Sequence, residues 1–353
     1  MTKKPRVSFN LSPGELDQAL AAWNRDLDVM APRRIKGRGR MAGQDVIRYA
    51  PVVAGNDIEW RQKSTFSPKV VLFPPNETLF HLVGDRIVEP SGDRPERPLL
   101  LFCRACDIHG VDRLDRVFLD NGPAPDPFYQ RRRARLRFAL IECATSMENC
   151  FCVSMGTNVA KDYSLSIRFL PDGGALVEVR DADLLAGIPG TAAAADFSPL
   201  FVQEDDSPVR VPDSDALARE IRENDLFDHP MWEPYSKRCI ACGRCNFSCP
   251  TCSCFSTLDA TSEDTPELGV RRRVWAGCHV DRFTEMAGGH DVRTDYGSRM
   301  RFKTMHKIHD FQQRFGTHMC VGCGRCDDQC PEYISFSTCI NRVADIVERK
   351  AEG

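Results

Sequence analysis

Eight cysteines lie in two copies of one twelve-residue pattern, CIACGRCNFSCP from Cys239 and CVGCGRCDDQCP from Cys320. Each run places thiols at positions i, i+3, i+6 and i+10 and puts a proline after the last. This is the spacing of the bacterial run that ligates [4Fe-4S] clusters, in which three thiolates hold one cluster and the fourth holds the other. The pattern therefore predicts an electron carrier with two clusters.

The expected ligand sets cross between the two runs. The first site takes three thiols of the first run and the last thiol of the second, namely Cys239, Cys242, Cys245 and Cys330. The second site takes the remaining four, namely Cys320, Cys323, Cys326 and Cys249. Gly243 and Gly324 let the chain turn between thiols and expose backbone N–H groups to the cluster sulfurs.

Structural zinc is the main alternative, because zinc also favours Cys-x-x-Cys pairs. A zinc site closes with four ligands from two spaced pairs. Here each run supplies four thiols by itself, three of them evenly spaced, and the run occurs twice. The spacing therefore favours two iron-sulfur clusters over a zinc-stabilised binding module.

A second group of cysteines lies in the N-terminal half. Cys103 and Cys143 follow apolar segments that are expected to be strands, and loops at the carboxyl ends of neighbouring strands are where α/β folds gather ligands. We expect a third cluster held by Cys106, Cys143, Cys150 and Cys152, with Cys103 a buried thiol at a strand end. The alternative is that these are core cysteines, since free cysteine is often buried.

Three further cysteines, Cys252, Cys254 and Cys278, follow the first run. They could supply three ligands to a further metal, or they could line the cluster pocket. The second interpretation is favoured because buried thiols are common.

Composition agrees with a redox subunit in a reducing compartment. The chain has 353 residues, and 47 basic against 50 acidic side chains give a net charge of −3, which argues against nucleic-acid binding. No apolar stretch reaches the roughly 18 residues of a membrane span, and the N-terminal segment lacks the apolar region of a secretory signal. Eight thiols committed as ligands favour the cytoplasm.

The segments predict a mixed α+β protein. A capping box at Ser12-Pro13-Gly14-Glu15 predicts a helix to about residue 28, and strands are expected at 98–103 and 138–143, with a hairpin around 171–174. We expect an N-terminal α/β domain over 1–200, a linker and short helix over 201–224, and a mainly helical ferredoxin-like dicluster domain over 225–353. The intervening stretch from 249 to 320 has several helical-looking pieces, and residues 337–349 predict a closing helix.

No motif for substrate chemistry accompanies the thiols. The sequence has no Gly-x-Gly-x-x-Gly dinucleotide fingerprint, no phosphate loop and no nucleophile elbow. We therefore expect no catalytic residue on this chain, and the substrate chemistry would belong to another protein of a complex.

Longer strings identify a family resemblance. RACDIHGVDRLD from Arg104, IECATSMENCFCVSMGTN from Ile141, CPTCSC from Cys249, RRRVWAGC from Arg271 and EMAGGHDVR from Glu285, with the second run, resemble the iron-sulfur electron-transfer subunit of the bacterial anaerobic sulfite reductases. That family is related to the beta subunits of cytoplasmic sulfhydrogenases. Its pattern has no fixed cysteine at position 103, which supports leaving Cys103 out of the third ligand set.

The resemblance implies a role in a complex. In that family a flavoprotein subunit oxidises NADH, the iron-sulfur subunit passes single electrons onward, and a sirohaem subunit reduces sulfite to sulfide. The alternative is the electron-transfer beta subunit of a sulfhydrogenase or NAD(P)-linked hydrogenase, which shares the same motifs. Both interpretations give this chain no catalytic site of its own.

Overall fold

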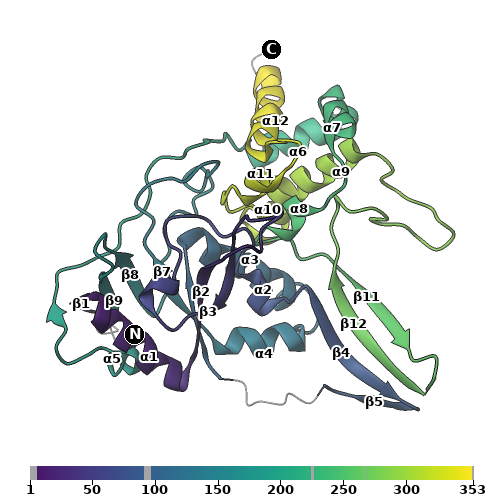
Figure 1. The fold of residues 1–353 in the computed structure, drawn as a ribbon. Helices are drawn as coiled ribbons and strands as arrows, with labels where there is room; N and C mark the ends of the chain where they lie inside the picture. The colour runs from purple at the N-terminus through teal and green to yellow at the C-terminus, as the bar shows by residue number, and fades with distance from the viewer. Residues whose placement is uncertain (1–5, 91–96, 224–225, 266, 352–353) are drawn as a thin grey trace.

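The computed structural model describes residues 6–90, 97–223, 226–265 and 267–351. Figure 1 shows a large sheet with flanking helices, a group of helices beside it and a long β-ribbon that projects from the molecule. The sheet is built from the first half of the chain. The group of helices carries both cysteine runs.

The large sheet has eight strands in the order β10-β1-β9-β8-β7-β6-β2-β3. The four central strands, β2 (Asp28–Ile35), β6 (Leu99–Cys103), β7 (Leu136–Ile141) and β8 (Leu165–Phe169), run parallel to one another. The outer strands pair antiparallel: β1 (Val7–Leu11), β3 (Val46–Pro51), β9 (Ala175–Val179) and the two-residue β10 (Ala193–Ala194). The carboxyl ends of β6 and β7 therefore meet at one edge.

Helices cover both faces of this sheet. Along β6, Leu100 and Phe102 pack with α1 (Pro13–Asp26) on one face, while Leu99, Leu101 and Cys103 pack with α3 (Ala105–Phe118) on the other. This alternation is the period of a strand that is buried on both sides. The expected capping box at Ser12 and Glu15 starts α1. Shorter helices complete this part: α2 (Lys69–Leu72), α4 (Pro127–Arg135) and α5 (Ala182–Leu185).

The helices that carry the runs enclose a second core. Its members are α6 (Ser214–Glu223), α7 (Glu233–Arg238), α8 (Arg244–Phe247), α11 (Arg325–Gln329), α12 (Phe336–Ala351) and the continuous helical stretch of α9 (Tyr296–Met305), η4 (His306–Asp310) and α10 (Phe311–Phe315). The segment η4 is a π-turn, a feature often found at functional sites. The closing helix expected at 337–349 corresponds to α12.

A four-stranded sheet joins the two halves of the chain. The hairpin β11 (Phe255–Thr261) and β12 (Leu268–Trp275) pairs through β12 with β4 (Asn76–Val83), which pairs with β5 (Arg86–Val88). This sheet is the ribbon that projects in Figure 1. Part of the segment between the runs, which was expected to be helical, is therefore β-structure. Residues 255–275 form a hairpin because β12 pairs with β4 of the N-terminal half.

The fold class is confirmed as mixed α and β with a mainly helical cluster-bearing part. The expected strands correspond to β6 and β7, although β7 ends at Ile141, two residues before Cys143, and the hairpin corresponds to β8 and β9. Helix α1 ends at Asp26 because Asp28 already starts β2. No helix among the described residues is long and apolar enough to cross a membrane. Residues 1–5, which open the segment tested for a secretory signal, lie outside those residues.

Candidate iron-sulfur sites

The two runs fold in the same way and lie against each other. Gly243 precedes α8 and Gly324 precedes α11, and both adopt the left-handed conformation at φ 68°. This is the turn expected of these glycines, and it favours a residue without Cβ. The two short helices are in contact, and Ser248 Oγ donates a hydrogen bond to Arg325 O at 3.4 Å.

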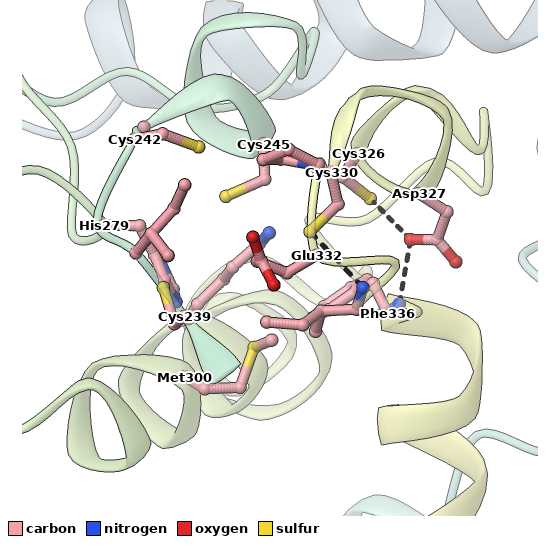
Figure 2. A pocket seen from close by; sticks show the side chains of 15 residues that line it. Cys239, Cys242, Cys245, His279, Met300, Cys326, Asp327, Cys330, Glu332 and Phe336 are labelled. Carbon is pink, nitrogen blue, oxygen red and sulfur yellow. Dashed lines mark hydrogen bonds between the residues drawn. The ribbon is translucent and has the colours of Figure 1, made fainter. Parts of the chain in front are cut away.

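The first site is a small cavity of about 30 Å³. All four expected thiols line it, together with Cys326 of the second run (Figure 2). His279, Met300, Lys303 and Phe336 form part of its wall, together with the carboxylates Asp327 and Glu332. Cys242 is exposed, whereas Cys239, Cys245 and Cys330 are partly buried, so one edge of the site faces solvent.

The second site lies deeper. Burial raises the pKa values of the Cys320 and Cys323 thiols, to about 12 and about 11, and the neighbouring Cys249 adds to both shifts. Burial, Asp327 and then Cys249 also raise the pKa of Cys326, although Lys303 opposes them. Cys249 of the first run thus lies among the three thiols of the second run, which is the crossed arrangement expected from the sequence.

Backbone amides point at the sulfurs of both sites. Ile334 N donates to Cys330 Sγ at 3.3 Å, Gly322 N donates to Cys320 Sγ at 3.5 Å, and Thr251 N donates to Cys249 Sγ at 3.5 Å. Such N–H donors stabilise thiolates and the added charge of a reduced cluster.

Three lysines, Lys69, Lys303 and Lys307, are each no more than 3% exposed beside these thiols. Lys307 Nζ donates to Cys249 Sγ at 3.4 Å and to Thr251 Oγ1 at 2.9 Å, and Lys69 Nζ donates to Cys252 O at 2.8 Å. Burial lowers the pKa of Lys303, but the neighbouring thiols Cys245, Cys326, Cys252 and Cys278 together outweigh it, and the net shift is upward.

Among the described residues, none of the three lysines forms an ion pair with a carboxylate. Burying an ammonium group without a carboxylate partner is costly, and for Lys69 burial lowers the pKa, so an anion nearby would stabilise the charged form of all three. Thiolate-bound clusters carry net negative charge and would supply it. The residues present therefore fit [4Fe-4S] clusters at both sites.

The thiols expected at the third site come from the first turn of α3 and from the loop that follows β7. Burial raises the pKa of the Cys152 thiol, and Cys150 and Cys143 add to the shift. Cys152 and Cys323 likewise add to the raised pKa of Cys106. The four thiols therefore share one region beside the second site, and Cys150 Sγ lies 3.7 Å from Cys323 O.

A buried guanidinium faces this third group. Arg104 is 4% exposed, and its Nη2 donates to Trp60 O at 2.7 Å. Its Nε and Nη1 have no hydrogen-bond partner in the described structure, while its charge lowers the pKa of Cys143 against the larger effect of burial. An anion held by these thiols would satisfy both nitrogens. Cys103 instead packs in the apolar core beneath α3.

Cys252 and Cys278 lie beside Asn246, which is 2% exposed, and neither they nor Cys254 line the first cavity. Asn246 Nδ2 donates to Cys278 Sγ at 3.3 Å and lies 3.7 Å from Cys252 Sγ, and Cys254 lies close enough to raise the pKa of Cys278 slightly. The described residues contain no group of three His, Cys, Asp or Glu side chains that could hold a single metal ion.

Sequence reasoning missed Asn246, Arg104 and the buried lysines. Lys303 and Lys307 had a signal that could have been used. They stand four residues apart on one helical stretch, and two like charges at this spacing destabilise a helix.

Comparison with known proteins agrees with this geometry. Residues 238–334 match the family model described as a 4Fe-4S dicluster domain. The chain carries two [4Fe-4S] clusters. It is also similar to Sulfhydrogenase 2 subunit beta of Pyrococcus furiosus, with 29% identity over 331 residues that cover 88% of this chain and 94% of the relative. No solved structure matches the chain.

Proposed function

We propose that this chain is an iron-sulfur electron-transfer subunit that relays single electrons between partner subunits of an oxidoreductase. The observation that carries the proposal is the pair of four-thiol sites beside three buried lysines without carboxylate partners. Bound [4Fe-4S] clusters accept and release one electron at a time. The lysines and backbone amides favour the more negative, reduced state of each site.

The positions of the sites suggest an order of transfer. We assign the third cluster to Cys106, Cys143, Cys150 and Cys152, next to Cys323 of the second site. The second site adjoins the first, because Cys326 also lines the first cavity. The relay would therefore run between the third site, the second and the first.

The first site is the exit or entry that a partner could reach. Cys242 is exposed, and the nearby Ile240 and Tyr333 are 57% and 87% exposed. Apolar side chains around an exposed ligand suit a docking face for another subunit. We expect electrons to cross between subunits here.

The complex we favour is of the sulfhydrogenase type, because the similarity to the Pyrococcus furiosus beta subunit spans most of both chains. An NADH-oxidising flavoprotein and a nickel hydrogenase subunit would then be the partners. The alternative is an anaerobic sulfite reductase with a flavoprotein and a sirohaem subunit, supported by strings such as RACDIHGVDRLD and CPTCSC. In both complexes this chain would work in the cytoplasm.

Affinity purification of the native complex under anaerobic conditions decides between them. A nickel-containing partner would support the first interpretation, and a sirohaem absorption spectrum would support the second. In either complex, Cys323→Ser should abolish NADH-driven turnover, whereas Cys339→Ser, at a buried thiol of α12, should not. Full NADH-driven turnover in the Cys323 variant would contradict the relay.

A further inference from the structure

His279 carries a polar atom that nothing described so far uses. The side chain is 3% exposed and lines the cavity of the first site, as Figure 2 shows. Its Nε2 is buried and has no hydrogen-bond partner in the described structure. A buried ring nitrogen without a partner is costly, so the atom indicates an acceptor that occupies the cavity.

A fixed network orients the ring. Asn246 Oδ1 accepts the backbone N–H of His279 at 3.1 Å, which turns Asn246 Nδ2 toward the sulfurs. Asn246 Nδ2 then donates to Cys278 Sγ at 3.3 Å, and Cys278 Sγ lies 3.2 Å from His279 Nδ1. Gly277 leaves room for Asn246, since a Cβ at this position would lie only 2.9 Å from the Asn246 side chain.

The same network selects the tautomer. Cys278 Sγ accepts the amide N–H of Asn246, so its own S–H is free to donate to His279 Nδ1. With Nδ1 accepting from Cys278, the ring proton lies on Nε2.

We propose that His279 Nε2–H donates a hydrogen bond to the cluster at the first site and thereby raises that cluster's reduction potential, with Cys278 and Asn246 as positioning residues. Cys278 is then a support for this donor and not a metal ligand. The inference rests on the proposed function only in requiring a cluster at the first site. It concerns how this chain sets the potential, which no sequence motif predicted.

A redox titration of the full chain, followed by EPR spectroscopy, tests the proposal. His279→Leu removes the donor and should make the midpoint potential of one cluster more negative. We expect a shift of about 59 mV, which corresponds to a tenfold change in the one-electron reduction constant. His279→Gln keeps an N–H donor, so its midpoint potential should lie between those of His279→Leu and the unchanged protein. His290→Leu, at an exposed histidine, is the matched control and should leave all midpoints unchanged.

A second readout separates a donor from a ligand. In protein labelled with ¹⁵N-histidine, pulsed EPR of the reduced clusters should detect one weakly coupled nitrogen that His279→Leu removes and His290→Leu retains. Cys278→Ala should weaken this coupling while iron content stays constant. This measurement keeps the proposal testable even if His279→Leu assembles its clusters poorly.

Three outcomes would overturn the inference. These are an unchanged midpoint in His279→Leu, a nitrogen coupling as strong as direct ligation, and a loss of iron in Cys278→Ala equal to one cluster. A chain that takes up no cluster at all would instead contradict the proposed function, so the two failures are distinguishable.

Discussion

Lys303 and Lys307 lie four residues apart on one helical stretch but face different thiols. Lys303 interacts with Cys245 of the first run and Cys326 of the second. Lys307 interacts with Cys249 and Cys320, which are both assigned to the second site. A cation fixed in a buried position stabilises the electron that a cluster gains, and it does so most for the nearest cluster.

This difference gives a selective prediction for cluster potentials. Lys303→Met should shift the midpoints of both clusters to more negative values, and Lys307→Met should shift chiefly the one at the second site. We expect shifts on the order of 59 mV, a tenfold change in the one-electron reduction constant. Anaerobic redox titration followed by EPR measures them, with Lys237→Met, at an exposed lysine, as the control. If the two variants shifted the midpoints of both clusters by equal amounts, the predicted selectivity of Lys307 for the second site would be contradicted.

The third site has its own test in iron content. Intact protein purified without oxygen should hold about 12 iron atoms per chain if three clusters are present. Replacing both Cys150 and Cys152 with Ser should lower the value to about 8, while Cys103→Ala should leave it near 12 because that thiol lies in the apolar core. Iron near 8 in the unchanged protein would exclude the third cluster.

The thiols of the two runs could be predicted from sequence because their spacing is local. The residues that surround them could not. Asn246 looks like any polar residue within the first run, and its contact with Cys278 joins positions 32 apart. Arg104 was part of a recognised string, but only the folded chain shows that its guanidinium reaches Cys143.

At the scale of elements, the pairing of β4 with β12 ties the cluster-bearing half to the first half. Arg273 on β12 is 1% exposed and donates to Glu77 Oε2 at 2.5 Å and to Asp126 Oδ2 at 2.6 Å. The guanidinium also lies over the rings of Phe73 and Phe255, at 5.2 and 5.3 Å. One buried arginine thus joins β4, α4 and the hairpin.

Neighbouring arginines on β12 provide a matched comparison. Arg273→Met should lower the free energy of unfolding by about 1–3 kcal/mol, because it removes the buried charge-assisted hydrogen bonds to Glu77 Oε2 and Asp126 Oδ2, although Arg132 still pairs with Glu77. Arg271→Met removes an exposed pair with Asp259 and should leave stability nearly unchanged. Denaturant unfolding of the full chain with clusters intact measures both. An equal loss of unfolding free energy in the two variants would show that the buried Arg273 contacts stabilise the protein no more than the exposed Arg271–Asp259 pair.

Strands β1, β2, β3 and β10 of the large sheet were not predicted. Strands β6 and β7 were predictable because their apolar runs are continuous, and β8 and β9 because turn residues separate them. The β11–β12 hairpin was not, since every residue of β11 is exposed and the three consecutive arginines of β12 indicate a charged surface. Its partner β4 lies far away in sequence, and Glu77 and Arg273 are 196 positions apart. Because the pairing is non-local, neither segment alone shows the alternation of apolar and polar residues by which a strand is recognised.

At the scale of the whole molecule, several contacts cross the division expected near residues 201–224. Phe151 and Met155 pack in the core of the cluster-bearing helices, and Trp275 packs against the core beneath α3. Arg325 in the second run forms an ion pair with Asp107 of α3 at 2.7 Å, and both side chains are almost fully buried. Phe151 N donates to Gly322 O at 2.8 Å beside the third group of thiols. The two parts are therefore joined at the cluster sites, as a relay between them requires.

The central claim is that the chain carries electrons and performs no substrate chemistry by itself. Stepwise anaerobic reduction of the isolated full chain, with electrons counted by coulometry and clusters followed by EPR, tests this most directly. The account predicts uptake of about one electron per [4Fe-4S] cluster, spectra broadened by interaction between neighbouring clusters, and no turnover of NADH, hydrogen or sulfite. Turnover by the isolated chain, or a protein that accepts no electrons despite a full complement of iron, would contradict it.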